Sequence, residues 1–268
     1  MTRSIRSLMV LAAMILAAMV LVALASAGFA TSALAADCDE ADAAHVEIAR
    51  LTEDLDIVLK DERSIRLVGV KALSTEAASR EPDPKLAGWI NEAAGGTVTL
   101  RLLSPIADRW GRVAGDVFIG GRHLQSSMAQ AGLAVARPDD LRGPCWAAIK
   151  AAEAQGRRDN AGLWAAPDTI LPATDGAKLS GHDGLFILAS GLVRHVSRGK
   201  GRSYVDFGLR GTNALFLTID ARALTRMEKL GFKLEQLTGR KILVRGVVLN
   251  GRAPHMVIDD LDAIEFWD

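Results

Sequence analysis

The densest group of side chains with binding chemistry lies within residues 194–204. Four cations and one aromatic residue stand close together there: Arg194, Arg198, Lys200, Arg202 and Tyr204. Guanidinium and ammonium groups in such a run can bind the anionic groups of nucleic acid, of lipid headgroups or of cell-envelope polymers. The same spacing also fits the solvated tip of a β-hairpin. The run is therefore a hypothesis for a polyanion-binding segment.

Other chemistries find less support in the residue types. The five histidines are scattered without metal-ligand spacing, and none stands near a cysteine as a nucleophile pair. The net charge is zero, so no overall basic field attracts nucleic acid. The halves differ, however: residues 37–167 hold 16 Lys/Arg against 20 Asp/Glu, and residues 184–268 hold 13 against 9.

Regular secondary structure must position these side chains. In the first half, the patterns predict strands at 45–51, 56–61, 64–70, 97–103 and 112–119, and helices at 85–94, 124–131 and 146–158. In the second half they predict strands at 186–196, 203–209, 214–219, 241–249 and 254–258, with one helix at 221–237. The tryptophans lie within apolar patterns, so we expect them in the core.

The motifs between Asp108 and Trp164 occur in a specific order. Asp-Arg-Trp-Gly-Arg precedes a strand, a Gly-Gly turn, a helix, Ala-Gly-Leu-Ala, a second helix and Gly-Leu-Trp. Over roughly residues 45–166 this order resembles the thermonuclease (staphylococcal-nuclease-like) family. The resemblance implies a mainly β fold, a five-stranded OB-type barrel with helices, and calcium-dependent nuclease activity in active members.

The second half carries a less specific resemblance. Three strands, a helix and two strands follow OB-fold order, and the segment GRKILVRGVV is similar to the small barrel that follows the nuclease domain in some exported bacterial homologues. We therefore expect a thermonuclease-like OB domain at 37–167, a linker at 168–184 and a second OB-like barrel at 185–268.

The resemblance also assigns candidate catalytic residues. Arg66 and Arg112 match the two arginines that hold the phosphate in active members, a role that suits the rigid guanidinium fork. The acidic half of the site departs from the family pattern. Lys71 falls where a metal-binding aspartate belongs, and Ser74 falls where the catalytic glutamate belongs.

Three acidic residues could replace the missing groups. The family has a second metal-ligand position upstream of the strand that carries Arg66, and by residue count Leu55 occupies it. Asp54 and Asp56 flank Leu55 and are candidate metal ligands. Glu76 lies two residues beyond the expected glutamate, so a shifted loop would make it the candidate base.

The N-terminal segment has the pattern of a leader. Arg3 and Arg6 precede an uncharged apolar run from 8 to 25 and small residues up to position 36, which is typical of a signal peptide over residues 1–36. The run is also long enough for an uncleaved membrane anchor. Export would favour a disulfide between Cys38 and Cys145. Such a bond would stabilise the folded domain by roughly 4–5 kcal/mol. The alternative is two unpaired thiols.

These patterns together predict an exported nuclease homologue, periplasmic or secreted, that has lost catalysis. It would bind nucleic acid, another polyanion or an envelope protein, and it would contact the membrane if the leader stays uncleaved. No cofactor is expected unless the protein hydrolyses phosphodiesters, in which case calcium is. Two alternatives stay open: an active calcium-dependent nuclease acting on DNA or RNA, and a tandem-barrel scaffold for protein partners.

Overall fold

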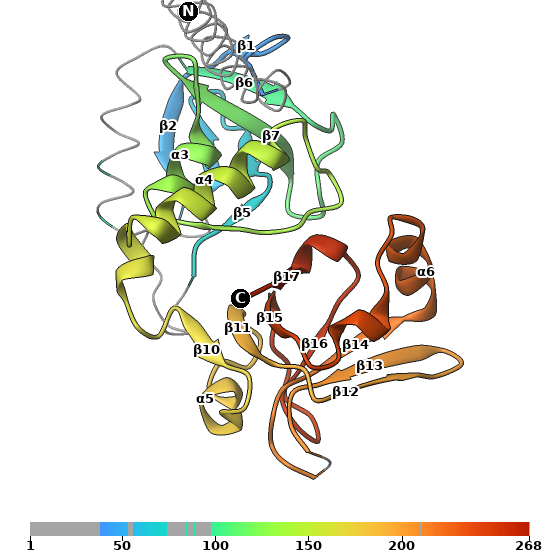
Figure 1. The fold of residues 1–268 in the computed structure, drawn as a ribbon. Helices are drawn as coiled ribbons and strands as arrows, with labels where there is room; N and C mark the ends of the chain where they lie inside the picture. The colour runs from blue at the N-terminus through green and yellow to red at the C-terminus, as the bar shows by residue number, and fades with distance from the viewer. Residues whose placement is uncertain are drawn as a thin grey trace, which may run out of the picture. The chain divides into compact units, whose positions relative to one another are not determined.

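The computed structural model describes residues 38–52, 56–73, 98–209 and 211–267, with the single positions Pro84 and Gly88 (Figure 1). The predicted leader at 1–36 and almost all of the predicted loop and helix between 74 and 94 lie outside these residues. Within the described part, no helix is both long and apolar enough to cross a membrane. Residues 39–268 belong to one compact unit.

The first half is built on a sheet with the order β1-β6-β7-β4-β3-β2, to which β8 is added beside β7. Its strands are β1 (Ala44–His45), β2 (Ile48–Leu51), β3 (Asp56–Leu59), β4 (Ser64–Leu67), β6 (Val98–Leu102), β7 (Arg112–Ile119) and β8 (Arg122–His123). The eight-residue β7 pairs antiparallel with β6 and parallel with β4. A small second sheet joins β5 (Val70–Lys71) to β9 (Val135–Ala136). The buried residues Ile57, Ile65 and Val117 form part of the core between these strands and the helices.

Two helices pack together against this sheet: α3 (Leu124–Gln130) and α4 (Trp146–Arg158). Their bounds agree with the sequence prediction within one residue. Gly156 allows α4 to approach α3, because a Cβ there would lie 2.6 Å from the Gln130 carbonyl oxygen. Gly132, at φ +65°, accepts a hydrogen bond from the backbone N–H of Leu163 in η1 (Gly162–Ala165) at 2.9 Å. The Ala-Gly-Leu and Gly-Leu-Trp motifs are therefore in direct backbone contact.

The second half contains two four-stranded sheets with the orders β10-β11-β15-β17 and β12-β13-β14-β16. The first consists of β10 (Ile170–Pro172), β11 (Phe186–Leu192), β15 (Lys241–Val247) and β17 (Ile264–Phe266), and the second of β12 (His195–Arg198), β13 (Arg202–Asp206), β14 (Phe216–Asp220) and β16 (His255–Val257). The antiparallel pairs β12–β13, β13–β14 and β11–β15 and the parallel pair β14–β16 are those an OB-type strand order requires. They support the predicted second barrel, which stays a prediction.

The predicted linker at 168–184 contains regular structure. Its strand β10 pairs in parallel with β11, and the short helix α5 (Gly176–Ser180) follows. Asp175 caps this helix by accepting the backbone N–H of Lys178. This segment therefore extends a sheet of the second half.

The predicted helix at 221–237 is wrong in its second part. Helix α6 (Ala221–Lys229) ends two residues before Gly231, whose φ of +91° is incompatible with a continuing α-helix. A separate 3-10 turn, η2 (Leu234–Leu237), follows, and a similar turn, η3 (Leu261–Ala263), precedes β17. Leu230, the C-cap of α6, is 74% exposed, because the chain has already left the helix there.

Candidate functional site

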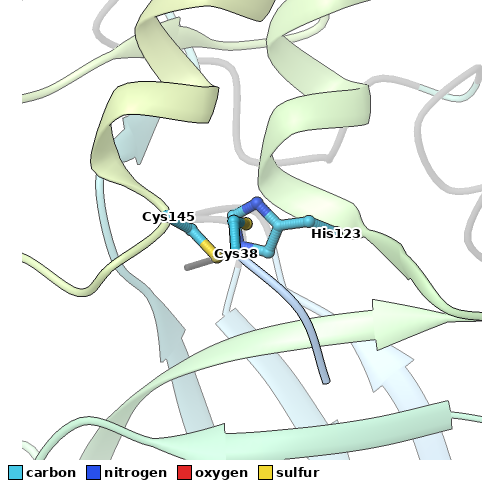
Figure 2. Close-up of side chains that lie close together, drawn as sticks. All are labelled: Cys38, His123 and Cys145. Atoms are coloured by element: carbon cyan, nitrogen blue, oxygen red, sulfur yellow. The ribbon is translucent and has the colours of Figure 1, made fainter. Parts of the chain in front are cut away.

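The predicted disulfide between Cys38 and Cys145 is confirmed. Cys145 is the residue before α4, and Figure 2 shows the ring of His123, the N-cap of α3, beside the two sulfur atoms. The Nη2 atom of Arg101 lies 3.0 Å from the Cys145 sulfur and 2.9 Å from Asp116. The bond therefore attaches the chain before β1 to the start of α4, in a partly buried polar environment.

Arg112 begins β7 and is held by two carboxylates. Asp108 accepts the backbone N–H groups of Trp110 and Arg112 at 2.9 and 3.0 Å, and it also accepts the side-chain Nε–H of Arg112 at 2.9 Å. The Nη1 atom of Arg112 donates to Asp56 on β3 at 3.0 Å. Burial alone would raise the pKa of Asp108, but the hydrogen bonds from Arg112 and Trp110 outweigh it and lower that pKa. The Asp-x-Trp-Gly-Arg motif is thus a turn closed by its own ends.

Arg66 on β4 is also held by a carboxylate. Its guanidinium donates through both Nη atoms to Asp139, which follows β9, and the Nη2–Oδ1 distance is 3.5 Å. The same carboxylate accepts the backbone N–H of Leu141 at 3.0 Å. Burial tends to raise the pKa of Asp139, yet the hydrogen bond from Arg66, with the charges of Arg66 and Arg137, lowers it below its ordinary value. Both arginines of the predicted phosphate clamp therefore carry intramolecular counter-charges.

The two arginines open into a cleft of about 1020 Å³ that reaches from the first half to β15 and β16. Its lining holds five cations, Arg66, Lys71, Arg112, Arg137 and Arg245, and six carboxylates, Asp56, Asp108, Asp139, Asp140, Asp259 and Asp260. Opposite charges are thus nearly balanced in the cleft. Trp110, at its edge, is 63% exposed, which corrects the expectation that the tryptophans are core residues. Its ring lies beneath two guanidinium groups, with Arg109 3.9 Å and Arg112 4.9 Å from the ring centroid.

The described part of this site holds no assembled set of calcium ligands. The ion needs several oxygen ligands, whereas Lys71 on β5 lines the cleft and the Asp56 carboxylate accepts a hydrogen bond from Arg112. Among the described residues, the group that could hold a metal ion is Cys38, His123 and Cys145 at the disulfide, where the two sulfur atoms are bonded to each other. Among the described residues, the carboxylates that line the cleft therefore do not form a group that could hold a metal ion.

The residues predicted for the nuclease site divide into two groups. Arg66, Arg112 and Asp56 come together, and the β3–β4 register pairs Asp56 directly with Arg66. Asp54 and Glu76 lie outside the described residues, as do Leu55 and Ser74. The sequence did not identify Asp108 and Asp139 as partners of the arginines. For Asp108, the signal was its position in the motif; Asp139 is 73 residues from Arg66, and no local pattern connects them.

The cationic run of the second half forms the hairpin of β12 and β13. Arg198 is not an open cation, because it is paired with Glu228 and Glu235 at 2.6 Å each, and these contacts raise its pKa. Arg194, Lys200 and Arg202 are exposed, and no ion pair is formed by them within the described residues. Tyr204 is 38% exposed on β13. The polyanion hypothesis therefore rests on three of the four predicted cations.

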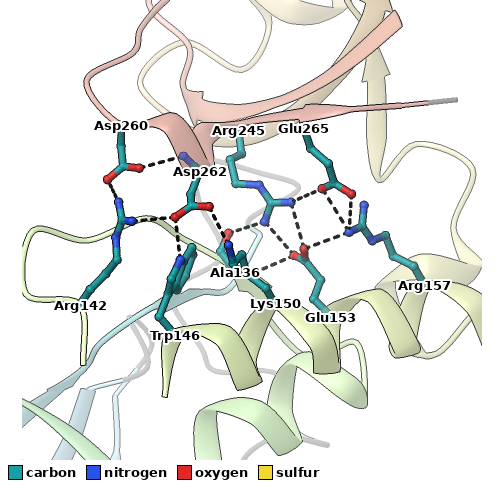
Figure 3. A network of polar contacts seen from close by, with 10 residues as sticks. All are labelled: Ala136, Arg142, Trp146, Lys150, Glu153, Arg157, Arg245, Asp260, Asp262 and Glu265. Carbon is teal, nitrogen blue, oxygen red and sulfur yellow. Dashed lines mark hydrogen bonds and ion pairs between the residues drawn. The ribbon is translucent and has the colours of Figure 1, made fainter. Parts of the chain in front are cut away.

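A polar network joins α4 to the second half (Figure 3). Arg245 on β15 donates to both oxygens of Glu153 at 3.0 and 2.9 Å, and to the backbone carbonyl of Ala136 at 2.7 Å. The backbone N–H of Ala136 donates to Glu153 at 2.7 Å. Glu265 contacts both Arg245 and Arg157.

The second part of this network is centred on Asp262. Its carboxylate accepts from Arg142, the Trp146 indole and Lys150 at 2.7–2.8 Å. The neighbouring Asp260 also pairs with Arg142. Carboxylates of the second half are thus neutralised by cations of α4 and the segment before it.

The fold and the paired arginines define a nuclease-like β domain with OB-type architecture. Residues 64–166 match the family described as Staphylococcal nuclease homologue. Over this segment, which is less than half of the chain, the protein is similar to that family, as its motifs predicted. No curated protein matches the chain.

Proposed function

We propose that this protein is a non-cleaving nuclease homologue that binds nucleic acid or a related polyanion outside the cytoplasm. The observation that carries the first part is the pairing of both clamp arginines. Arg66 is engaged by Asp139 and Arg112 by Asp108 and Asp56, so a phosphate would have to displace carboxylates that already satisfy these groups. Hydrolysis would also need a metal cage, and Lys71 opposes one.

The charge distribution supports binding at the second half. Residues 184–268 hold 13 Lys/Arg against 9 Asp/Glu. Three of those carboxylates, Asp260, Asp262 and Glu265, pair with cations of residues 142–157. The hairpin cations Arg194, Lys200 and Arg202 are exposed, and although Asp220 lies opposite Arg202 in the β13–β14 register, none of the three forms an ion pair within the described residues. This favours contact with phosphates.

An assay with a fluorescent 20-nucleotide single strand tests both parts. The full exported chain is incubated with calcium or with chelator, and cleavage is read on a gel. We expect no calcium-stimulated cleavage. Cleavage that requires calcium and disappears in Arg112→Ala would instead establish the active nuclease.

Binding is read by anisotropy in the same samples. We expect an affinity that falls steeply with salt, because released counterions drive phosphate binding. Replacing Arg194, Lys200 and Arg202 together by alanine should weaken it strongly. The matched control removes three exposed cations of the first half, Lys60, Arg63 and Arg122, and should have a smaller effect. Equal losses in the two triple variants would argue against the hairpin as the contact.

A scaffold for a protein partner is the second candidate function. The cleft edge exposes apolar side chains, including Trp110, Val247 and Val257, which suits a protein surface better than a phosphate backbone. Pull-down from an envelope fraction separates the two functions. A partner retained after nuclease treatment and lost in Trp110→Ala would favour the scaffold.

Export itself rests on the N-terminal sequence pattern and on the disulfide, which is typical of oxidising compartments. The mass of the mature protein from a periplasmic or culture fraction tests it. Loss of about 36 residues is expected; a full-length mass in the membrane fraction would favour the anchor.

A further inference from the structure

The sheet of β12, β13, β14 and β16 has an outward face with an unusual composition. Residues Val205, Leu217 and Met256 are fully buried and face the core. Since neighbours along a strand point to opposite faces, Tyr204, Phe216 and His255 lie on the outer face, one on each of three adjacent strands. Of these three rings, the sequence pattern had pointed to Tyr204.

These three rings form a continuous row. The centroids of Tyr204 and Phe216 are 6.4 Å apart with planes tilted by 43°, and those of Phe216 and His255 are 5.2 Å apart with planes within 15°. Val257, on the same face of β16, is exposed beside them. Tyr204 is 38% exposed, and Phe216 and His255 are partly exposed. An aromatic strip on a sheet face is thus open to solvent.

Charges around the strip indicate which ligand it takes. Arg202 precedes Tyr204 by two residues and therefore shares its face, and the exposed Lys200 lies in the adjoining hairpin turn. Two carboxylates also lie on this face. Asp220 is the N-cap of α6 and accepts the backbone N–H of Ala223 at 2.7 Å.

The second carboxylate, Asp206, is half-buried opposite His195 in the β12–β13 register. Burial raises the pKa of Asp206, and the nearby His195 opposes this shift. Asp220 is exposed and lies opposite Arg202 in the β13–β14 register, so it offsets part of that charge, whereas Asp206 is half-buried. The net charge of the surrounding half is positive. A polyanion that also carries planar rings matches this combination better than a protein surface or a cationic ligand.

We propose that the Tyr204–Phe216–His255 row is a stacking platform for the bases of a single-stranded nucleic acid, with Arg202 and Lys200 contacting its phosphates. This inference rests on the proposed polyanion-binding function and specifies its ligand. Stacking on exposed rings is tolerant of sequence, because every base has a π-face, and it requires bases that are not already paired. The platform therefore selects single strands over duplexes and over polymers without bases.

The chain contains one tyrosine, which makes the test direct. Incorporation of 3-fluorotyrosine places a single ¹⁹F nucleus in the protein, at position 204. We titrate the full chain with a 20-nucleotide oligothymidylate and with a 20-unit abasic strand that has the same phosphates. The oligothymidylate is expected to shift the ¹⁹F resonance and the abasic strand to leave it nearly unchanged. Resonance shifts of equal size with both strands would overturn the platform.

Affinities of variants give the second readout. Tyr204→Ala should weaken oligothymidylate binding by about 5- to 150-fold, which is the stacking of one base, and leave abasic binding unchanged. Tyr204→Phe keeps the ring and should bind like the original protein. Arg202→Ala should weaken both strands alike. The matched control, Phe266→Ala, removes an aromatic ring that is 47% exposed on β17 outside this face, and should change neither affinity.

The outcomes separate this inference from the function beneath it. If both strands bind equally and Tyr204→Ala is silent, the protein binds polyanions but the platform is wrong. If neither strand binds the correctly folded protein, the polyanion function and the platform both fail. If His255→Ala, which leaves the larger rings in place, also weakens the thymidylate strand selectively, the row acts as one surface.

Discussion

Glu153 and Arg245 form a buried pair whose disruption should have a large effect on stability. Glu153 is 1% exposed and Arg245 5% exposed, and the pair is bidentate. Arg245→Met removes the guanidinium and leaves the Glu153 carboxylate buried, with the backbone N–H of Ala136 at 2.7 Å and Arg157 at 3.6 Å as its contacts in the network. Removing one partner of a buried pair costs about 3–5 kcal/mol.

Denaturant unfolding followed by tryptophan fluorescence measures this loss. The double variant Glu153→Gln with Arg245→Met removes the stranded charge, while the amide oxygen can still accept the Ala136 N–H. We therefore expect the double variant to be more stable than Arg245→Met alone. The matched control is Arg198→Met, which breaks an exposed pair with Glu228 and Glu235 and should change the free energy of unfolding by at most about 1 kcal/mol.

Two results would refute this reasoning. Arg245→Met within about 1 kcal/mol of the original protein would mean that water reaches the carboxylate and solvates it. A double variant less stable than the single one would mean that the hydrogen bonds of the network, rather than the unpaired charge, determine the cost. If Arg245→Met does not fold, Arg245→Lys retains a charge and gives a measurable intermediate value.

Three further predictions concern stability. Reduction of the Cys38–Cys145 disulfide should lower the free energy of unfolding by about 4–5 kcal/mol, measured with and without dithiothreitol, and an unchanged melting temperature would contradict a closed loop of this length. Because the pKa of Asp139 is lowered in the folded protein, its pair with Arg66 stabilises fully above the ordinary value of 3.8 and is lost as the pH falls through the lowered pKa. Asp139→Asn should therefore flatten the decline of melting temperature in that acidic range, and parallel curves would reject the pair. Met227→Ala, on the buried face of α6, should lower the free energy of unfolding by about 2–5 kcal/mol, whereas Leu230→Ser should change it by at most about 0.5 kcal/mol. Similar losses for the two variants would favour the longer helix.

Much of the first half could be predicted from local pattern. The alternation in β7 and the helical spacing of α4 are properties of neighbouring residues, so the predicted and observed bounds agree closely. The break after Lys229 could not be read as easily, because the apolar spacing continues through Leu234 in a separate turn. Only the positive φ of Gly231 interrupts the helix there.

The site shows the same division between local and long-range information. Arg112 and its partner Asp108 are four residues apart in one motif, which makes their pairing visible in the sequence. Asp139 follows β9, which pairs with β5, the strand after β4 that carries Arg66, and this pairing is not visible in the sequence. Whether a clamp arginine is open or already engaged is therefore a property of the tertiary fold.

The contact between Arg245 and Glu153 also makes the stability of each half depend on the other half. A chain cut between them would uncover a carboxylate on α4 and a guanidinium on β15, each shaped for the other. A protein truncated to either half would therefore need a substitution at this position to remove the unpaired charge. The folded state of each half thus depends on the presence of the other.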